Sequence, residues 1–294
     1  MAKKKIDVER LRGVVNMGRE AEESMEESMI ISVHVDPACP RWLALAVKTA
    51  LVPERDAVVN VSSLVSNPTV ADVDVNVIVA GHSEEEVRSA IRALAAKRQR
   101  VVVVAESSLD IPETNLPTKL SQFVFDVVAS ENGPFRERFS AALLDATDKD
   151  VSCAANFAFC REAATARLVS RVAARNVFMG LADFIPGAGM PLITMNQINM
   201  GFDIAASYGH GLTIGRVPEV IFIVAAGFAY RGIAKMLCQA IPPFGIVIRI
   251  GVAYGGTLVT GRTLATHFSQ DLPPAQEEVA SRPKIVSTPV VGEA

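Results

Sequence analysis

The feature that most constrains this chain is a long stretch of sequence with almost no charge. Between Asn176 and Phe268, 93 residues carry only eight formal charges, about 9%, against 21% for the whole chain. Helices that are apolar on most of their faces must bury those faces. Three arrangements therefore stay open for this stretch: tilted or hairpin-like insertion into a membrane, an interface between subunits, or a docking surface for a partner protein.

The rest of the chain divides around this stretch into regions of different composition. The first 28 residues hold six basic and seven acidic side chains and are predicted to form a charged helix. Residues 29–147 are predicted to form an α/β domain, and residues 148–268 a hydrophobic domain of four helices. The last 26 residues contain four prolines and little periodicity, so a disordered tail is predicted over 269–294.

Apolar strands alternate with helices in the predicted α/β domain. Short β-branched runs predict strands at 29–35, 73–80, 100–105 and 123–129, and helical spacing predicts helices over 41–51 and 134–146. A further helix follows Ser83, a predicted N-cap with three glutamates directly behind it. Strands that are apolar throughout and alternate with helices indicate a mainly parallel sheet covered on both faces.

The turn after the first strand lacks the residues of a phosphate-binding loop. Such a loop reads GxxxxGK[ST], with glycines for close backbone approach, a lysine for the phosphates and a hydroxyl for magnesium. Here the turn has no glycine, Pro37 and Pro40 have no N–H to donate, and Asp36 places negative charge where a phosphate would sit. Arg41 stands at the place of the lysine, but Trp42 follows it. The sequence therefore predicts a vestigial turn, with no nucleotide, cofactor or catalytic residue.

The order of these elements resembles that of an Era-type, Ras-like GTPase domain. Residues 74–81 (DVNVIVAG) lie where such domains carry their magnesium-linked DxxG strand. Residues 105–108 (AESS) follow a strand at the place of the guanine-reading NKxD motif but lack that motif, and residues 128–133 (VASENG) look like the last guanine-contacting loop. The resemblance implies a degenerate P-loop GTPase-like domain, a pseudo-GTPase rather than an enzyme.

Four helices are predicted in the C-terminal half, at 151–184, 192–208, 218–239 and 246–267, separated by breaks rich in proline and glycine. These breaks and several polar positions are similar to those of the bacterial YcjF-like family, a hydrophobic helical domain of unknown function associated with GTPases. The matching positions are 185–187 (IPG), 192–197 (LITMNQ), Met200, 204–205 (IA), 208–209 (YG), 241–245 (IPPFG), Ala253, Thr257, Gly261 and 267–268 (HF). The resemblance implies a membrane-associated protein fused to, or encoded beside, a GTPase domain. It brings no set of enzymatic residues with it.

Hydropathy alone does not decide between the membrane and the other arrangements. The longest uncharged run, 184–202, has 19 residues but includes two prolines and three amides, whereas a spanning helix needs about 20 mostly apolar residues. Arg249 would lie mid-helix in hydrocarbon, at a cost of about 2.5–3.5 kcal/mol. Buried amides need partners, so Asn196 and Gln197 either pin helices together or face an interface. Together with Tyr208 and Arg249 they are the candidate interaction residues.

Charge and cysteine content exclude other classes of function. A net charge of −3 argues against nucleic acid as a partner. Four cysteines without a CxxC pair and four widely spaced histidines predict no metal site and a reducing, cytoplasmic environment. The sequence thus predicts a non-enzymatic scaffold or GTPase partner, associated with the cytoplasmic face of the inner membrane. The alternatives are a diverged NTPase that couples hydrolysis to a membrane or oligomeric helical domain, and a soluble, cytoplasmic homo-oligomer.

Overall fold

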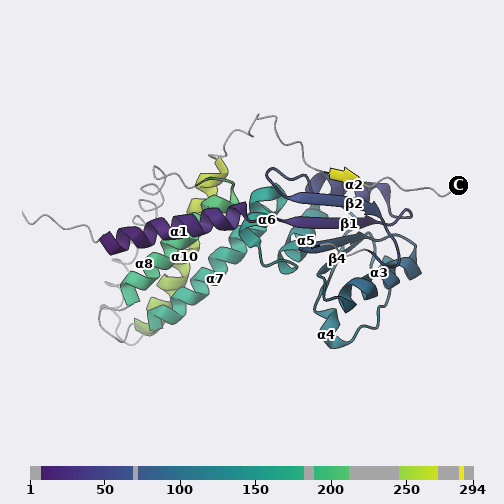
Figure 1. The fold of residues 1–294 in the computed structure, drawn as a ribbon. Coiled ribbons are helices and arrows are strands. Elements are labelled where there is room, and N and C mark those ends of the chain that lie inside the picture. Colours follow the sequence, from purple (N-terminus) through teal and green to yellow (C-terminus); the bar gives the residue numbers. More distant parts are fainter. Residues whose placement is uncertain (1–7, 69–71, 182–188, 212–244, 271–284, 288–294) are drawn as a thin grey trace, which may run out of the picture. The chain divides into compact units, whose positions relative to one another are not determined.

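The computed structural model describes residues 8–68, 72–181, 189–211, 245–270 and 285–287, and the chain divides into two compact units (Figure 1). The helical unit comprises Met1–Glu26 and Ala164–Pro274. The α/β unit comprises Glu27–Ala163 and Ala275–Ala294. In sequence, the α/β unit is therefore inserted between the first helix of the helical unit and the others. This division differs from the predicted one, which kept residues 1–28 apart and began the helical domain at 148.

A parallel sheet forms the centre of the α/β unit, in the strand order β5-β4-β3-β1-β2-β6. Every neighbouring pair of strands is parallel. The predicted α/β class with a mainly parallel sheet is confirmed. The strands are β1 (Ile30–Val35), β2 (Val58–Ser63), β3 (Val75–Val79), β4 (Val101–Ala105), β5 (Val124–Val128) and β6 (Ile285–Ser287).

Two of these strands were not predicted from the sequence. β2 reads VVNVSS. Its polar residues interrupt the continuous apolar run that predicts the other strands. β6 lies inside the predicted disordered tail, so that prediction is wrong for Ile285–Ser287, where β-branched side chains favour pairing with the edge of β2. The four predicted strands correspond to β1, β3, β4 and β5, with ends that differ by at most two residues.

Helices cover both faces of the sheet. The chain passes from β1 to β2 through α2 (Arg41–Ala50), and in the opposite direction from β3 to β4 through α3 (Glu84–Ala96). Because such crossovers are right-handed, α2 and α3 lie on opposite faces. α5 (Asn132–Asp145) contacts α2 and shares its face. The remaining helices of this unit are α4 (Thr118–Ser121), α6 (Asp150–Asn156) and the 3₁₀ turns η1 (Ser108–Asp110) and η2 (Ala158–Cys160).

The core of the α/β unit forms where these helices meet the central strands. Alternate residues of β3 and β4 pack against the apolar face of α3, whose side chains recur at helical spacing. The residues of this cluster are Leu64, Ile78, Ala80, Val87, Ala90, Ile91, Leu94, Val101, Val103 and Ala105. The intervening residues of the two strands are equally buried, as expected for parallel strands that are covered on both faces.

Polar side chains gather on the α3 side of β1, β2 and β3. Ser32 pairs in register with Asn60 and Asn76, and His34 pairs with Ser62. His34 Nδ1 lies 3.1 Å from Ser62 Oγ, and His34 Nε2 lies 3.4 Å from Asn76 Oδ1. Burial lowers the pKa of His34, although the hydrogen bond to Asn76 acts in the opposite direction. The described residues between β2 and β3 form no helix, so this face is less apolar than the sequence predicted.

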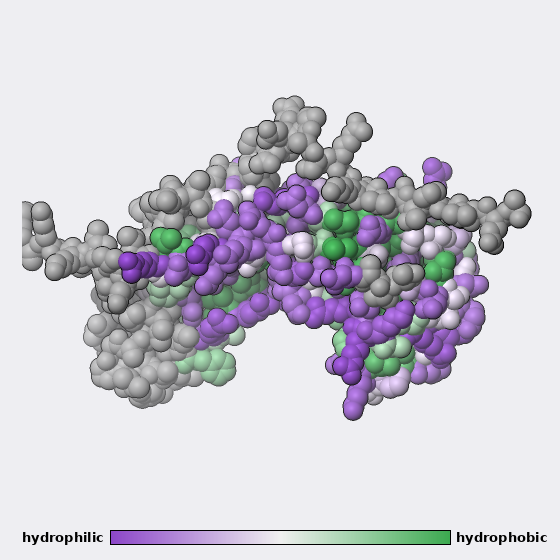
Figure 2. All heavy atoms as spheres, in the orientation of Figure 1, coloured by the Kyte–Doolittle hydropathy of each residue, from purple (hydrophilic) through white to green (hydrophobic). Residues whose placement is uncertain are grey.

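Four helices are described in the helical unit, and the charged N-terminal helix is one of them. α1 (Val8–Glu26) packs on α8 (Gly189–Ser207), which also contacts α10 (Gly245–Gln270); α7 (Arg161–Leu181) completes the set (Figure 1). The buried residues of α1 recur every three or four positions, the spacing of one helix face: Val14, Gly18, Ala21 and Met25. Its outward face is hydrophilic (Figure 2). The predicted charged N-terminal helix is therefore present, and one of its faces is buried.

Of the predicted helices of the C-terminal half, two correspond to described helices, one is interrupted and one lies outside the described residues. The predicted helix 151–184 is interrupted at Phe157, whose backbone is extended, so that α6, η2 and α7 replace it. α8 and α10 correspond to the predicted helices 192–208 and 246–267. The predicted helix 218–239 lies outside the described residues. Among the described helices, none combines the length and apolar character that crossing a membrane would require.

Candidate functional site

The candidate site lies at the carboxyl ends of β1 and β3. We call this place the reversal point, because the chain moves toward one edge of the sheet after β1 and toward the other edge after β3. β1 lies between β2 and β3, and the connections from β1 and from β3 leave toward opposite edges. In open parallel sheets, ligands bind outside the carboxyl ends of the strands at this point, because the two connections separate there and leave a crevice. The residues to inspect are therefore those that follow β1 and β3.

Asp36 occupies that position. It follows β1 directly and is fully buried, with 0% of its surface exposed. Its Oδ1 accepts hydrogen bonds from the backbone N–H of Ala38 at 2.9 Å and from Ser83 Oγ at 2.8 Å. Its Oδ2 accepts from the N–H of Gly81 at 3.0 Å and from that of Ser83 at 3.1 Å. One carboxylate thus joins the loop after β1 to the loop after β3.

The same hydrogen bonds keep Asp36 ionised. Burial by itself raises the pKa of this carboxyl, but the bonds from Ala38, Ser83 and Gly81 together outweigh burial, and the pKa lies below its ordinary value. The positive end of α3 lies next to it, since Ser83 is the residue before that helix. The prediction of a side-chain cap at Ser83 is wrong, because its hydroxyl donates to Asp36 and makes no capping bond to the helix.

Gly81 brings the two loops into direct contact. A Cβ at this position would lie 2.4 Å from the backbone carbon of Ala38 and 2.4 Å from the backbone nitrogen of Cys39. Real Cβ contacts are not this short, so only glycine fits. In the GTPase resemblance Gly81 is the glycine of the DxxG strand. Here its backbone N–H donates to Asp36, and the space beside it is filled by protein.

The candidate residues Asn196 and Gln197 lie in a cluster of amides inside the helical unit. Asn196 Nδ2 donates to Asn176 Oδ1 at 3.1 Å, and Asn176 Nδ2 donates to Thr257 Oγ1 at 3.0 Å. Gln197 Nε2 donates to the same hydroxyl at 3.5 Å, and that hydroxyl donates to the carbonyl of Ala253 at 2.7 Å. The cluster joins α7, α8 and α10. Of the two roles that the sequence left open, these contacts favour pinning helices together.

The other two candidates are not part of this cluster. Tyr208 is buried, with 8% of its surface exposed, and lies eleven residues after Gln197, about 16 Å along a helix axis. It follows Ser207, the last residue of α8. Gly209 comes next with a φ of +78°, a conformation that glycine adopts without strain and that commonly terminates helices. Arg249 belongs to α10, but its side chain lies outside the described residues.

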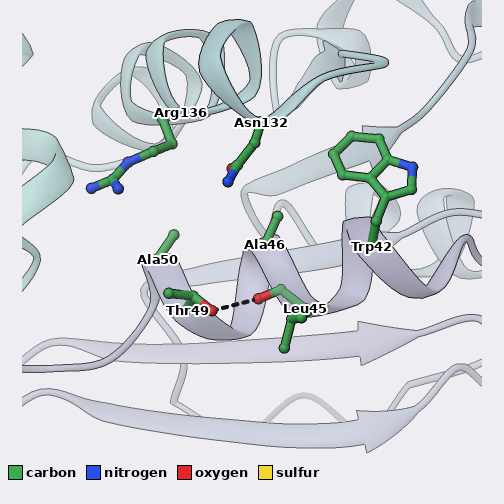
Figure 3. Close-up of a pocket in the computed structure, with 7 residues that line it drawn as sticks. All are labelled: Trp42, Leu45, Ala46, Thr49, Ala50, Asn132 and Arg136. Atoms are coloured by element: carbon green, nitrogen blue, oxygen red, sulfur yellow. Dashed lines mark hydrogen bonds between the residues drawn. The ribbon is translucent and has the colours of Figure 1, made fainter.

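An open groove lies between α2 and α5, and the sequence did not predict it. It has a volume of about 260 Å³. Its lining comes from one face of α2 and from the first two turns of α5 (Figure 3). Trp42, the only tryptophan of the chain, stands at one end, and its Nε1–H donates to Glu106 Oε1 at 2.7 Å. The lining residues are Trp42, Leu45, Ala46, Thr49, Ala50, Asn132 and Arg136. We call this feature the α2–α5 groove.

Two signals in the sequence could have indicated the groove. Ala46 and Ala50 are four residues apart, so both fall on one side of α2 and leave space there. Asn132 and Arg136 have the same spacing on α5. Periodicity identifies such faces but not which two helices meet, and that pairing becomes visible only once the strand order is known. In the described part of the chain, no group of three or more His, Cys, Asp or Glu side chains could hold a metal ion.

Comparison of the chain with protein-family models, with curated proteins and with solved structures finds no match. The YcjF-like and GTPase-like resemblances therefore rest on the residues quoted for them and stay predictions. The geometry of the molecule itself carries the functional argument.

The carboxyl group of Asp203 in α8 should make the free energy of unfolding of the helical unit depend on pH. Burial raises the pKa of this carboxyl to about 6, the negative charge of Glu20 on α1 adds to the effect, and Arg171 on α7 reduces it. Asn199 Nδ2 donates to Asp203 Oδ2 at 3.3 Å. Because the folded pKa lies above the ordinary value of 3.8, the folded state binds the proton more tightly. The free energy of unfolding then falls as the pH rises between these two values.

Replacing Asp203 with asparagine should remove this dependence. At pH 7.5 we expect Asp203→Asn to be more stable than the natural protein by on the order of 2 kcal/mol, and at pH 4 the two should differ little. Hydrogen exchange of the α8 amides at both pH values measures the effect. Asp148→Asn, at an exposed site of the α/β unit, is the control. An equal effect of Asp203→Asn at both pH values would contradict the explanation.

Proposed function

We propose that this protein is a non-enzymatic scaffold. In this proposal its α/β unit has the layout of a degenerate, GTPase-like nucleotide-binding domain but binds no nucleotide, and it recruits partner proteins instead, a GTPase among the candidates. The observation that carries the proposal is the buried Asp36 carboxylate at the reversal point of the sheet.

The hydrogen-bond donors at this point support the proposal. A phosphate bound there would need backbone N–H groups and the positive end of a helix. The N–H groups of Ala38, Gly81 and Ser83 all donate to Asp36 side-chain oxygens, and that of Cys39 donates to the carbonyl of Asp36. The two prolines of the turn have none to offer. A nucleotide would have to displace a hydrogen-bonded anion and would be repelled by its charge.

The experiment is a calorimetric titration of the full chain with GTP and with ATP, each with and without magnesium. We expect no binding at micromolar nucleotide and no hydrolysis. Micromolar, magnesium-dependent binding that Arg41→Ala abolishes would overturn the proposal and favour the diverged NTPase. Arg41 is exposed at the start of α2, so its replacement tests the phosphate contact without disturbing the core.

The helical unit is the part through which we propose membrane association. Its support is the low charge of residues 176–268, because apolar helices with so few charges need burial. Native cells are fractionated, and the membrane pellet is washed with alkaline carbonate and then extracted with detergent. Retention in the pellet until detergent is added supports an embedded unit. A carbonate-released chain that is large by sizing would replace this proposal with the soluble homo-oligomer.

A further inference from the structure

The outer edge of β2 is covered by a short strand from the C-terminal tail, β6, which is drawn in yellow in Figure 1. The two strands are parallel, and their register pairs Val59 with Ile285, Asn60 with Val286 and Val61 with Ser287. β2 has six residues and β6 has three, so half of β2 has a register partner on this side. Adding an extended segment to a sheet edge is a common way of binding a partner, because the N–H and C=O groups of the edge provide the affinity.

The residue types of β6 match this edge poorly. Successive residues of a strand belong to opposite faces of the sheet, and residues that pair well across two strands stabilise the sheet. On β2, Asn60 belongs to the polar face and Val61 to the other face. The register sets Val286 opposite Asn60 and Ser287 opposite Val61. An apolar residue is thus paired with a polar one and a polar residue with an apolar one, and only the third pair is matched in polarity.

The sequence also limits the length of the strand that the tail can offer. Pro283 lies two residues before β6 and Pro289 two residues after it, and proline has no N–H to donate to a ladder. Only the five residues 284–288 are free of proline here, against six residues in β2. The segment that joins α10 to β6 has 14 residues, 271–284. A strand held by three register pairs can leave the sheet edge while the rest of the unit stays folded.

We propose that the edge of β2 is the docking site for an extended segment of a partner protein, and that β6 occupies this edge until the partner segment displaces it. The partner segment runs parallel to β2. It places β-branched apolar residues opposite Val59 and Val61 and hydroxyl or amide residues opposite Asn60 and Ser62, a pattern that β6 does not have. This inference rests on the proposed scaffold function and names the place and the chemistry of its contact with a partner.

The edge-facing groups of β2 indicate which substitution releases β6. The N–H groups of Val58 and Leu64 bond to carbonyls on the β1 side. Successive N–H groups of a strand point to opposite sides, so those of Val59 and Val61 point to the β6 side. Val286 lies between these two residues in the register. Val286→Pro removes the N–H at that position and should free the edge, whereas Val291→Pro, outside β6 in the same tail, is the control.

The test uses a fluorescein-labelled peptide in which valine and threonine alternate over six residues between terminal lysines. A second peptide has the same composition, with the valines and the threonines in separate blocks. Fluorescence anisotropy follows the titration of each peptide with the full-length protein and with its Val286→Pro variant. The alternating peptide should bind about fivefold or more tightly than the block peptide, because only alternation matches both faces of β2. No binding of the alternating peptide to Val286→Pro, or equal binding of the two peptides, would overturn the proposal.

Variants of β6 show whether the tail and the peptide compete. Val286→Pro should strengthen binding of the alternating peptide about tenfold or more, because the edge is then free in every molecule. Val286→Thr combined with Ser287→Val corrects the two mismatched pairs and should weaken binding about threefold or more, because β6 then holds the edge more firmly. Val291→Pro should leave the affinity unchanged. The same affinity in the natural protein and in both β6 variants would show that β6 does not compete and would overturn the proposal.

Hydrogen exchange locates the peptide on the protein. In Val286→Pro, binding should protect the amides of β2. In the natural protein it should expose those of β6, and β5, at the opposite edge of the described sheet, should not change in either case. Protection of β5 in place of β2 would assign the peptide to the other edge and would overturn the proposal.

Further outcomes separate this inference from the proposed function. If the natural protein forms a dimer that Val286→Pro dissociates and Val291→Pro does not, the tail strand of a second copy is the occupant, and the partner segment is withdrawn. If neither the peptide nor a nucleotide binds, the assignment of the β2 edge fails while the nucleotide-free scaffold stands. Nucleotide binding at the reversal point would remove the scaffold function even if the peptide result held.

Discussion

Replacing Asp36 with alanine is expected to lower the free energy of unfolding of the α/β unit by several kcal/mol. The change leaves three backbone N–H groups and the hydroxyl of Ser83 without their acceptor. A buried donor that loses its partner costs about 1–3 kcal/mol. Only the bond from Gly81 is fully buried and the other three are part-buried, so the total loss lies near the lower end for four donors, on the order of 4–6 kcal/mol. Small domains have a free energy of unfolding of only about 5–15 kcal/mol. The substitution therefore removes a large share of the stability of the unit.

Urea unfolding followed by the fluorescence of Trp42 measures this effect, because that tryptophan lies in the α/β unit. Asp36→Asn, which keeps the shape and one carbonyl acceptor, should fall between alanine and the natural protein. Asp56→Ala, at an exposed position, is the control. A loss below about 1 kcal/mol for Asp36→Ala would show that the carboxylate does not hold the two loops together.

The pH dependence of this contribution has a definite sign. The folded pKa of Asp36 lies below the ordinary value of 3.8, so the unfolded state binds the proton more tightly. The stabilisation by the Asp36 carboxylate is fully present at pH values above the ordinary pKa. It is lost as the pH falls through the lower pKa of the folded state. Asp203 behaves in the opposite way, because its pKa is raised. Acid should therefore weaken the Asp36 linkage and favour the helical unit around Asp203.

Alanine at Gly261 should separate α10 from α7. A Cβ there would lie 2.4 Å and 2.7 Å from the two methyl carbons of Val169. Valine in a helix has one strongly preferred rotamer and cannot turn away, so the helices themselves must move. Overpacking of this kind costs about 1–3 kcal/mol, more than the up to about 1 kcal/mol that replacing glycine gains for the helix. We expect a net loss of stability in the helical unit.

Gly255 provides the matched comparison on the same helix. Nothing lies within 4 Å of a Cβ built at this position, so Gly255→Ala should stabilise α10 by up to about 1 kcal/mol. Hydrogen exchange of the α7 and α10 amides measures both variants. Val169→Ala combined with Gly261→Ala should recover part of the loss, since the clash is then removed. Shifts of the same sign for both glycines would refute the close approach.

The α/β class could be predicted because its central strands are apolar throughout. β3 and β4 read VNVIV and VVVVA, and few other structures accommodate such runs between helical segments. β2 could not be predicted in this way because it is not apolar throughout. Its alternate residues Asn60 and Ser62 belong to the polar face of the sheet. In the described residues of the connection between β2 and β3, no helix covers that face.

The functional residues were only partly predictable. The missing glycines of the first turn predict a vestigial phosphate turn, which stays a prediction, and the sequence places the negative charge of Asp36 where a phosphate would sit. That this carboxylate bonds to Gly81 and Ser83 could not be predicted, because those residues are 45 and 47 positions away in sequence. The partners of Asn196 and Gln197 are also distant in sequence, at 20 and 60 positions. Local sequence specifies that a buried amide needs a partner but not which helix provides it.

The insertion of the α/β unit within the helical unit has a consequence for synthesis on the ribosome. α1 ends at Glu26 and its packing partner α8 ends at Ser207, which is 181 residues later. At about 5–20 residues per second, roughly 10–40 s pass before α8 is complete. Throughout that interval the apolar face of α1 cannot pack on α8. α1 thus leaves the ribosome well before the helix on which it docks, and chaperones can bind its apolar face during that interval.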